Sequence, residues 1–161
     1  MHPIPLRAAP TDLKKLLGGA MEALVQQAKQ GEISLHVEAG DDIPIIQADS
    51  EKIAWAVTTL VGNALRFVKR GTRRMPGGAI VVRIARDKGD VAITVVDDGP
   101  GIPPEKLPWL FKRAAGTVHA AGLALMLVHE VVAAHGGTVD VKSATEGAER
   151  GTRITLRLPV S

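Results

Sequence analysis

The chain has 161 residues, of which 45% are apolar and 23% are charged, and its net charge is +3. This length suits one domain with a buried core. The absence of cysteine excludes disulfides, thiolate metal sites and cysteine nucleophiles. The positive excess is small and aromatic residues make up only 2%, so we expect no nucleic-acid partner. With no apolar run of roughly 18 residues and no signal peptide, we expect a cytoplasmic domain that makes no membrane contact.

The first third of the chain predicts a lead-in, a helix and two strands. Residues 1–10 hold three prolines and no periodic pattern, which indicates an extended segment. Thr11 is the expected N-cap of a helix that Gly31 ends. Alternation over 33–38 predicts a strand with one buried face, and a second short strand is expected over 43–47.

A second helix is expected from a cap at Asp49 or Ser50 to about Lys69, and its apolar interior predicts burial on most sides. The remaining expected elements are strands over 79–86 and 91–96 joined by a hairpin, a helical turn over 107–111, a loop over 112–120, a helix over 121–135, and strands over 138–143 and 152–158. This order of elements predicts a mixed sheet covered on one face by helices.

Asn63 is a polar residue on the second, otherwise apolar helix. It can be a satisfied core asparagine, because a buried amide without partners costs about 1–3 kcal/mol. It can also offer its carbonyl oxygen to Mg²⁺, a cation that takes oxygen ligands. Arg66 and Phe67 follow about one turn along, and they add a cation and a flat apolar surface. A nucleotide needs these same groups.

The segment DDGPGIP, residues 97–103, follows an apolar strand. Gly99 and Gly101 carry no side chain and allow a ligand to approach the backbone closely. The carboxylate of Asp97 can accept a hydrogen bond from an amino group such as that of adenine. The alternative is an ordinary tight turn with a solvated aspartate.

Gly122 stands at the start of the last predicted helix. Free backbone N–H groups and the helix dipole attract phosphate at such a position. The alternative is a loop glycine beside an amphipathic helix.

Taken together, the order and spacing of these segments resemble the ATP-binding domain of sensor histidine kinases, in the superfamily shared with gyrase-type and Hsp90-type ATPases. DSEKIAWAVTTLVGNALRFV is similar to the N box of that family, and DDGPGIP to its first glycine box. LPWLFKR resembles the phenylalanine box, AAGLALMLVHEVVAAHGG the second glycine box, and GTRITLRLP the closing strand. The lead-in resembles the join that follows the dimerisation helices of the family.

The resemblance implies an α+β, two-layer α/β sandwich of the Bergerat type, with a mixed, mostly antiparallel sheet. It implies a lead-in over 1–10 and an ATP-binding kinase domain over 11–161. The implied site residues are Asn63 as the Mg²⁺ ligand, Arg66 facing phosphate, Phe67 near adenine, Asp97 on the adenine amino group, Gly99, Gly101 and Ile102 at the floor of the adenine pocket, Gly122 and Leu123 at the helix beneath the phosphates, and 112–121 as the lid. Asn63 and Arg66 are the implied catalytic residues.

Three positions depart from the family pattern. Thr59 stands where ATPase relatives carry a glutamate that activates water, and a threonine cannot act as that base at neutral pH. This argues against a hydrolytic ATPase. Ala120 and Ala124 replace common glycines of the second glycine box, and an added methyl group can crowd phosphate.

The resemblance implies binding of Mg-ATP and transfer of the γ-phosphate to a histidine of a dimerisation domain, in cis or in trans. A response regulator would act downstream, in a two-component system whose sensor can be membrane-bound. No motif like H-E-x-R-x-P occurs here, so we interpret His36, His129 and His135 as structural or solvated. The alternatives are a nucleotide-sensing or protein-interaction module without phosphoryl transfer, and a stand-alone serine kinase that inhibits a sigma factor.

Overall fold

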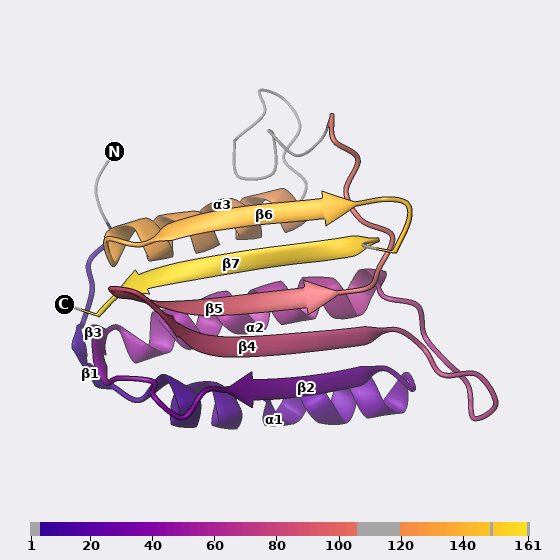
Figure 1. Ribbon diagram of the computed structural model, residues 1–161, viewed down its shortest axis with the longest axis horizontal. Helices are drawn as coiled ribbons and strands as arrows, with labels where there is room; N and C mark the ends of the chain where they lie inside the picture. Colours follow the sequence, from indigo (N-terminus) through magenta and orange to yellow (C-terminus); the bar gives the residue numbers. More distant parts are fainter. Residues whose placement is uncertain (1–3, 106–119, 149, 161) are drawn as a thin grey trace.

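The computed structural model describes residues 4–105, 120–148 and 150–160, with the backbone alone described for 120–124. The elements in chain order are β1 (Ala9–Thr11), α1 (Leu13–Gln30), β2 (Ser34–Ala39), β3 (Ile46–Ala48), α2 (Ser50–Phe67), β4 (Ala79–Asp87), β5 (Asp90–Asp97), α3 (Ala120–Ala134), β6 (Thr138–Ala144) and β7 (Gly151–Pro159). Figure 1 shows this arrangement. Within the described ranges, none of the helices combines the length and the apolar character that crossing a bilayer requires.

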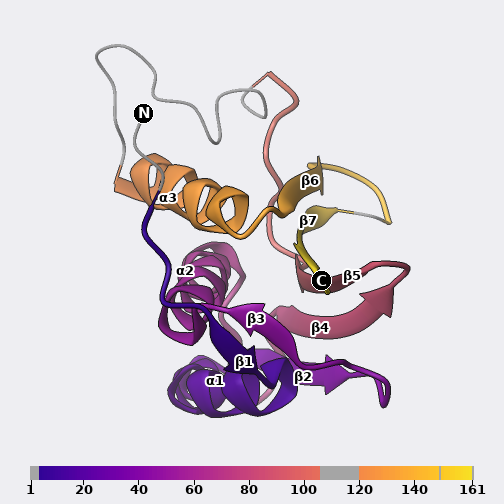
Figure 2. The ribbon, with the colours of Figure 1, turned by 90° about the vertical axis from the view of Figure 1, so that its left-hand side faces the viewer.

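A five-stranded sheet in the order β2-β4-β5-β7-β6 forms one layer of the fold. β2 and β4 are parallel, and the other neighbouring pairs are antiparallel. The three helices lie together on one face of this sheet, as Figure 2 shows. The predicted α+β fold, a two-layer sandwich with a mixed, mostly antiparallel sheet, is therefore confirmed.

The core lies between the helices and the sheet, because apolar residues recur at helical spacing on one side and at every second strand position on the other. Its largest fully buried side chains are Leu13, Leu17 and Met21 of α1, Ile53, Val57 and Leu60 of α2, Ile80 and Ile84 of β4, Ile93 of β5, Leu156 and Leu158 of β7, and Ile46 of β3.

The N-terminal prediction needs two corrections. The N-cap of α1 is Asp12, whose extended backbone lets its carboxylate accept a hydrogen bond from the Lys15 amide. Thr11 is buried in β1, and its hydroxyl contacts the carbonyl oxygens of Ala9 and Ala48. The end of the lead-in is therefore a short strand, because β1 pairs with β3 in a separate two-stranded sheet.

Asp49 is the N-cap of α2, one of the two expected caps. The helix ends at Phe67, two residues before the expected end. Val68 leaves the helical conformation, with φ −71° and ψ 141°, while its N–H still donates to the Ala64 carbonyl. Val68 then contributes its side chain to the core.

Candidate functional site

At one end of the sheet, a row of polar side chains follows the last apolar residues of the helix-covered face. On the helix-covered face, the alternating apolar positions are Val91, Ile93 and Val95 on β5, Leu158, Leu156 and Ile154 on β7, and Val139 and Val141 on β6. The next position on each strand is Asp97, Thr152 and Ser143, respectively. The strand register places Thr152 opposite both Asp97 and Ser143. The three side chains therefore share one face and one end of the sheet, at the right in Figure 1.

Asp97 is half-buried in this row. Its Oδ1 accepts a hydrogen bond of 2.8 Å from the Gly99 amide. Burial raises the pKa of Asp97, while hydrogen bonds from the backbone amides of Gly99 and Thr152 act in the opposite direction. A carboxylate has about four acceptor positions, so Asp97 retains capacity to accept a hydrogen bond from a ligand donor.

The turn after β5 packs backbone to backbone against the β6–β7 hairpin. Gly101 has a φ of +77°, and a Cβ there would overlap the Ala144 carbonyl. Gly151 has a φ of +130°, and a Cβ there would overlap the Asp97 carbonyl. Only glycine fits these two close approaches without a shift of the backbone. The sequence analysis expects a ligand to approach the backbone at Gly101, whereas the group that approaches it in the structure is the protein's own hairpin.

The C-terminal end of α2 lies beside the same turn. A Cβ built on Gly99 would be 3.7 Å from both the Phe67 carbonyl oxygen and a methyl group of Val68. Asn63 is half-buried, whereas the side chain of Phe67 is 59% exposed. Within the described part of the chain, the side chains of Asn63 and Arg66 take part in no hydrogen bond or ion pair. The bland alternative of a core asparagine satisfied by protein groups therefore has no support among these residues.

Thr59 lies on α2 one turn before Asn63 and is half-buried. Residues four apart on a helix share a face. Thr59 is thus on the Asn63 side of α2, as its place in the N box requires. The neighbouring Thr58 uses its hydroxyl on the carbonyl of Trp55.

The start of α3 is at the same end of the fold as Asp97 and the end of α2 (Figure 1). Gly122 and Leu123 lie in its first turn, as expected. The backbone N–H groups of the first three helical residues, the last of which is Gly122, have no intrahelical partner. The helix begins at Ala120, so the last two residues of the expected lid, Ala120 and Ala121, are helical instead. The helical turn over 107–111 and the rest of the lid lie outside the described residues.

Two residues of this site, Ser143 and Thr152, were missed by the sequence analysis. Ser143 Oγ accepts a 2.7 Å hydrogen bond from the Ile102 amide and lies 2.9 Å from Thr152 Oγ1. A signal for them was present, since the apolar alternation of three strands stops at a polar residue. Finding them requires the strand register, which shows that the three polar residues are neighbours.

The positions of the three histidines agree with their interpretation as structural or solvated. His36 is exposed on β2. His135 is structural, since its Nε2 accepts a 3.0 Å hydrogen bond from the Asp49 amide and its Nδ1 lies 2.8 Å from the Val131 carbonyl oxygen. Because Nε2 is the acceptor, Nδ1 carries the proton that is donated to Val131. His129 is exposed on α3 and has an interaction partner.

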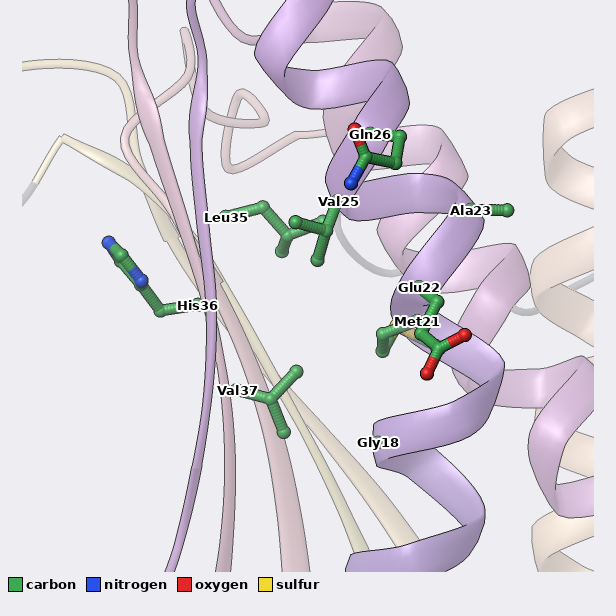
Figure 3. A pocket seen from close by; sticks show the side chains of 9 residues that line it. All are labelled: Gly18, Met21, Glu22, Ala23, Val25, Gln26, Leu35, His36 and Val37. Carbon is green, nitrogen blue, oxygen red and sulfur yellow. The ribbon is translucent and has the colours of Figure 1, made fainter.

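An open pocket of about 510 Å³ lies elsewhere, between α1 and the edge strand β2. In Figure 3, Leu35 and Val37 point toward α1, and His36 points away from it. The lining residues are Gly18, Met21, Glu22, Ala23, Val25, Gln26, Leu35, His36 and Val37. None of them belongs to the predicted site, so this pocket is a gap at the border of the core.

Within the described ranges, no group of three or more histidine, cysteine, aspartate or glutamate side chains is placed to hold a metal ion. The amide oxygen of Asn63 is a hard ligand that has no hydrogen-bond partner among the residues that the structure describes, which suits Mg²⁺. Mg²⁺ usually keeps several waters and is bound by few protein groups together with substrate phosphates. The residues present therefore fit a magnesium ion that arrives with a phosphate ligand, rather than one held by a protein cage.

Comparison with known proteins gives a consistent result. Residues 48–161 match the family model described as histidine kinase-, DNA gyrase B- and HSP90-like ATPase. The chain is 34% identical over 166 residues to the sensor histidine kinase ZraS of Escherichia coli K12, covering 100% of this chain and 33% of ZraS. The chain thus spans about a third of the length of such relatives.

Two solved structures share the fold. Full-length ShkA in complex with AMPPNP superposes with a TM-score of 0.82 at 27% identity, covering 99% of this chain and 32% of ShkA. Histidine kinase ThkA in complex with the response regulator TrrA superposes with a TM-score of 0.74 at 19% identity, covering 96% of this chain and 42% of the other. From the family match we conclude that the chain belongs to the histidine kinase-, DNA gyrase B- and HSP90-like ATPase family.

Proposed function

We propose that the domain binds Mg-ATP and presents the γ-phosphate to a histidine on a dimerisation domain of the same sensor kinase or of a partner chain. One observation supports this most strongly. A half-buried carboxylate, an asparagine amide with no partner among the described residues, and a helix N-terminus lie toward the same end of the fold. These groups match the amino group, the metal-bound phosphates and the phosphate oxygens of one ligand.

In this proposal each predicted residue has one role. Asp97 accepts a hydrogen bond from the adenine amino group, next to the turn that holds Gly99, Gly101 and Ile102. Phe67 packs at the exposed side of the base. The remaining roles concern the phosphates. Asn63 binds Mg²⁺ and Arg66 neutralises charge. The start of α3 at Gly122 and Leu123 lies beneath the phosphates, where the free N–H groups of the first turn donate to phosphate oxygens.

Phosphoryl transfer needs little covalent chemistry from this domain. Catalysis is mostly positioning and neutralisation of charge on the transferred group. Mg²⁺, when bound, supplies charge neutralisation at the phosphates. Asn63 and Arg66 are the groups that orient and neutralise, and neither side chain is hydrogen-bonded or ion-paired to another residue in the described part of the chain. Thr59 provides no base for water, which favours transfer to an acceptor over hydrolysis.

The wider setting follows from the same proposal. Residues 1–10 are a lead-in from a histidine-bearing dimerisation domain, and 11–161 are the kinase domain. A response regulator receives the phosphoryl group downstream, in line with the complex of ThkA and TrrA. The domain works in the cytoplasm, with no nucleic-acid partner and no membrane contact of its own.

A second candidate is a nucleotide-sensing or protein-interaction module without phosphoryl transfer. Ala120 and Ala124 favour it, because they replace common glycines of the second glycine box, where an added methyl group can crowd phosphate. Asn63, which has no partner within residues 4–105, 120–148 and 150–160, and the half-buried Asp97 favour retained nucleotide binding in either case.

Transfer is tested by mixing the protein with a matching dimerisation domain and γ-labelled ATP. Acid-labile label on the histidine supports the kinase, and its absence with intact ATP binding would leave the sensing module.

Binding is tested by calorimetric titration of two variants. Asp97→Asn should lower the affinity for ATP and for ADP alike, with or without Mg²⁺, by about ten- to a hundredfold. The reason is that a charge-assisted hydrogen bond is worth about 1.5–3 kcal/mol. Asn63→Ala should mainly remove the Mg²⁺-dependent part of binding. Asp98→Asn is the matched control, because Asp98 is exposed and its Oδ1 accepts from the Ala79 amide at the other side of the turn.

The control should bind ATP like the parent. If Asp97→Asn binds ATP as tightly as the parent, the proposed hydrogen bond between Asp97 and the adenine amino group is wrong. Unfolding of Asn63→Ala, seen by circular dichroism, would favour a structural asparagine instead.

A further inference from the structure

Ser143 joins the turn after β5 to both strands of the β6–β7 hairpin through one hydroxyl group. Its Oγ lies 2.7 Å from the Ile102 nitrogen and 2.9 Å from the Gly151 carbonyl oxygen. It also lies 2.9 Å from Thr152 Oγ1. Ser143 is half-buried at the end of β6, on the helix-covered face of the sheet. These three contacts determine which way the hydroxyl hydrogen of Ser143 points.

Counting hydrogens fixes the direction of each bond. A serine hydroxyl has one hydrogen and two acceptor positions. The Gly151 carbonyl can only accept, so the hydrogen of Ser143 is used there. The Ile102 amide can only donate, so Ser143 accepts from it. The third bond must then have Thr152 as the donor, because Ser143 has no second hydrogen.

The Thr152 hydroxyl can therefore only accept a hydrogen bond on the side facing away from Ser143. Its only hydroxyl hydrogen points to Ser143, and no other described residue hydrogen-bonds to its lone pairs. Thr152 is the direct cross-strand partner of Asp97, on the same face of the sheet. Cβ atoms of such pairs are about 4.5–5.5 Å apart. Thr152 and Asp97 therefore present two neighbouring acceptors at this end of the sheet.

We infer that Ser143 is a specificity-determining positioning residue, which holds the Thr152 hydroxyl as an acceptor beside Asp97 and so selects bases that carry an exocyclic amino group. The inference rests on the proposed binding of a nucleotide at this end of the sheet. A base with a carbonyl oxygen in place of that amino group meets acceptors only. The carbonyl oxygen of such a base loses its hydrogen bonds to water on binding and gains no hydrogen-bond donor there, which costs free energy.

The test compares ATP with inosine triphosphate, which replaces the adenine amino group by a carbonyl oxygen. Dissociation constants of both nucleotides with Mg²⁺ are measured by calorimetry. The parent should prefer ATP by at least about tenfold. Ser143→Ala frees the Thr152 hydroxyl to turn and donate, so the preference should fall by about fivefold, the value of one ordinary hydrogen bond. Ser143→Thr keeps the hydroxyl and should keep the preference.

The preference, rather than affinity alone, separates positioning from a merely structural effect. If Ser143 only supported the turn through its contact with Ile102, its loss would weaken the binding of both nucleotides equally. The ratio of their two dissociation constants would then be unchanged. Thr152→Val removes the acceptor with little change of volume and should lower the ratio by itself. In the Thr152→Val background, Ser143→Ala should change the ratio no further, because the hydroxyl that Ser143 orients is gone.

The outcomes distinguish this inference from the proposed function. If the parent binds no ATP, the nucleotide proposal fails and the inference falls with it. If the parent prefers ATP and folded Ser143→Ala keeps the full preference, the inference alone is wrong. Should Ser143→Ala unfold, Thr152→Val still decides, since an unchanged preference in that variant would overturn the role given to its hydroxyl.

Discussion

Replacing Asp49 by asparagine should cost about 2 kcal/mol of folding free energy at neutral pH. Asp49 is buried at the start of α2, and its carboxylate accepts three hydrogen bonds. Oδ1 accepts from the Lys52 amide at 3.2 Å. Oδ2 accepts from the Arg7 amide at 2.9 Å and from Lys52 Nζ at 3.1 Å. The residue thus caps the helix and fastens the lead-in at the same time.

The magnitude follows from the pKa of Asp49. The hydrogen bond from the Arg7 amide, helped by the amide and the ammonium group of Lys52, outweighs burial and lowers this pKa from 3.8 to about 2. A lowering of this size corresponds to about 2 kcal/mol in favour of the charged form. The folded pKa is the lower one, so the stabilisation is fully present above about pH 4 and is lost as pH falls through about 2. About half of it remains at pH 3.

Urea denaturation of the parent and of Asp49→Asn, from pH 7 to pH 3, measures this contribution. The gap between the two proteins should be about 2 kcal/mol at pH 7 and about half as large at pH 3. Asp12→Asn is the matched control, because Asp12 caps α1 through the Lys15 amide alone. An asparagine caps nearly as well as an aspartate, so the control should lose only a few tenths of a kcal/mol. An equal loss in both variants, or a gap that does not depend on pH, would refute the reasoning.

Two further variants test other contacts. Gly101→Ala should weaken ATP binding and lower the free energy of unfolding by more than about 1 kcal/mol, because alanine is strained at φ +77° and its methyl group would overlap a carbonyl of the hairpin. Gly147→Ala is the control, measured by the same titrations and denaturations. Gly147 has φ +85° with open space around it, so this variant adds only the backbone strain. His135→Ala should cost about 1–3 kcal/mol in urea denaturation, because the Asp49 amide loses its acceptor; an unchanged denaturation midpoint would show that water replaces the ring.

Local patterns were sufficient where one segment decides its own structure. The Asp49 cap, the hairpin between β4 and β5, and the glycine turn after Asp97 follow from residue types at short spacing. The choice of Asp12 over Thr11 did not, since both residue types cap helices well. It depends on β3, 35 or more residues along the chain, whose pairing draws Thr11 into a strand.

The site shows the same division. Asp97 is identifiable because its own turn is unusual, whereas Ser143 and Thr152 stand in ordinary strands. Their meaning depends on register, since a shift of one residue would turn each side chain to the opposite face of the sheet. Registers of β5, β7 and β6 are set by long-range pairing. The hydroxyl network is therefore a property of the assembled sheet, and no single segment predicts it.

The Asp49 substitution also tests whether the two ends of the helical layer act independently. Asp49 and His135 lie at the start of α2 and just beyond the end of α3, whereas Asn63 and Gly122 lie toward the opposite ends of these helices. An α-helix of 18 residues, such as α2, is about 27 Å long. Effects at sites this far apart usually add without coupling. Folded Asp49→Asn should therefore bind ATP as the parent does at pH 7, despite its lower stability. A changed ATP dissociation constant in calorimetry, with the protein fully folded, would mean instead that the attachment of the lead-in biases the nucleotide site through α2 and α3.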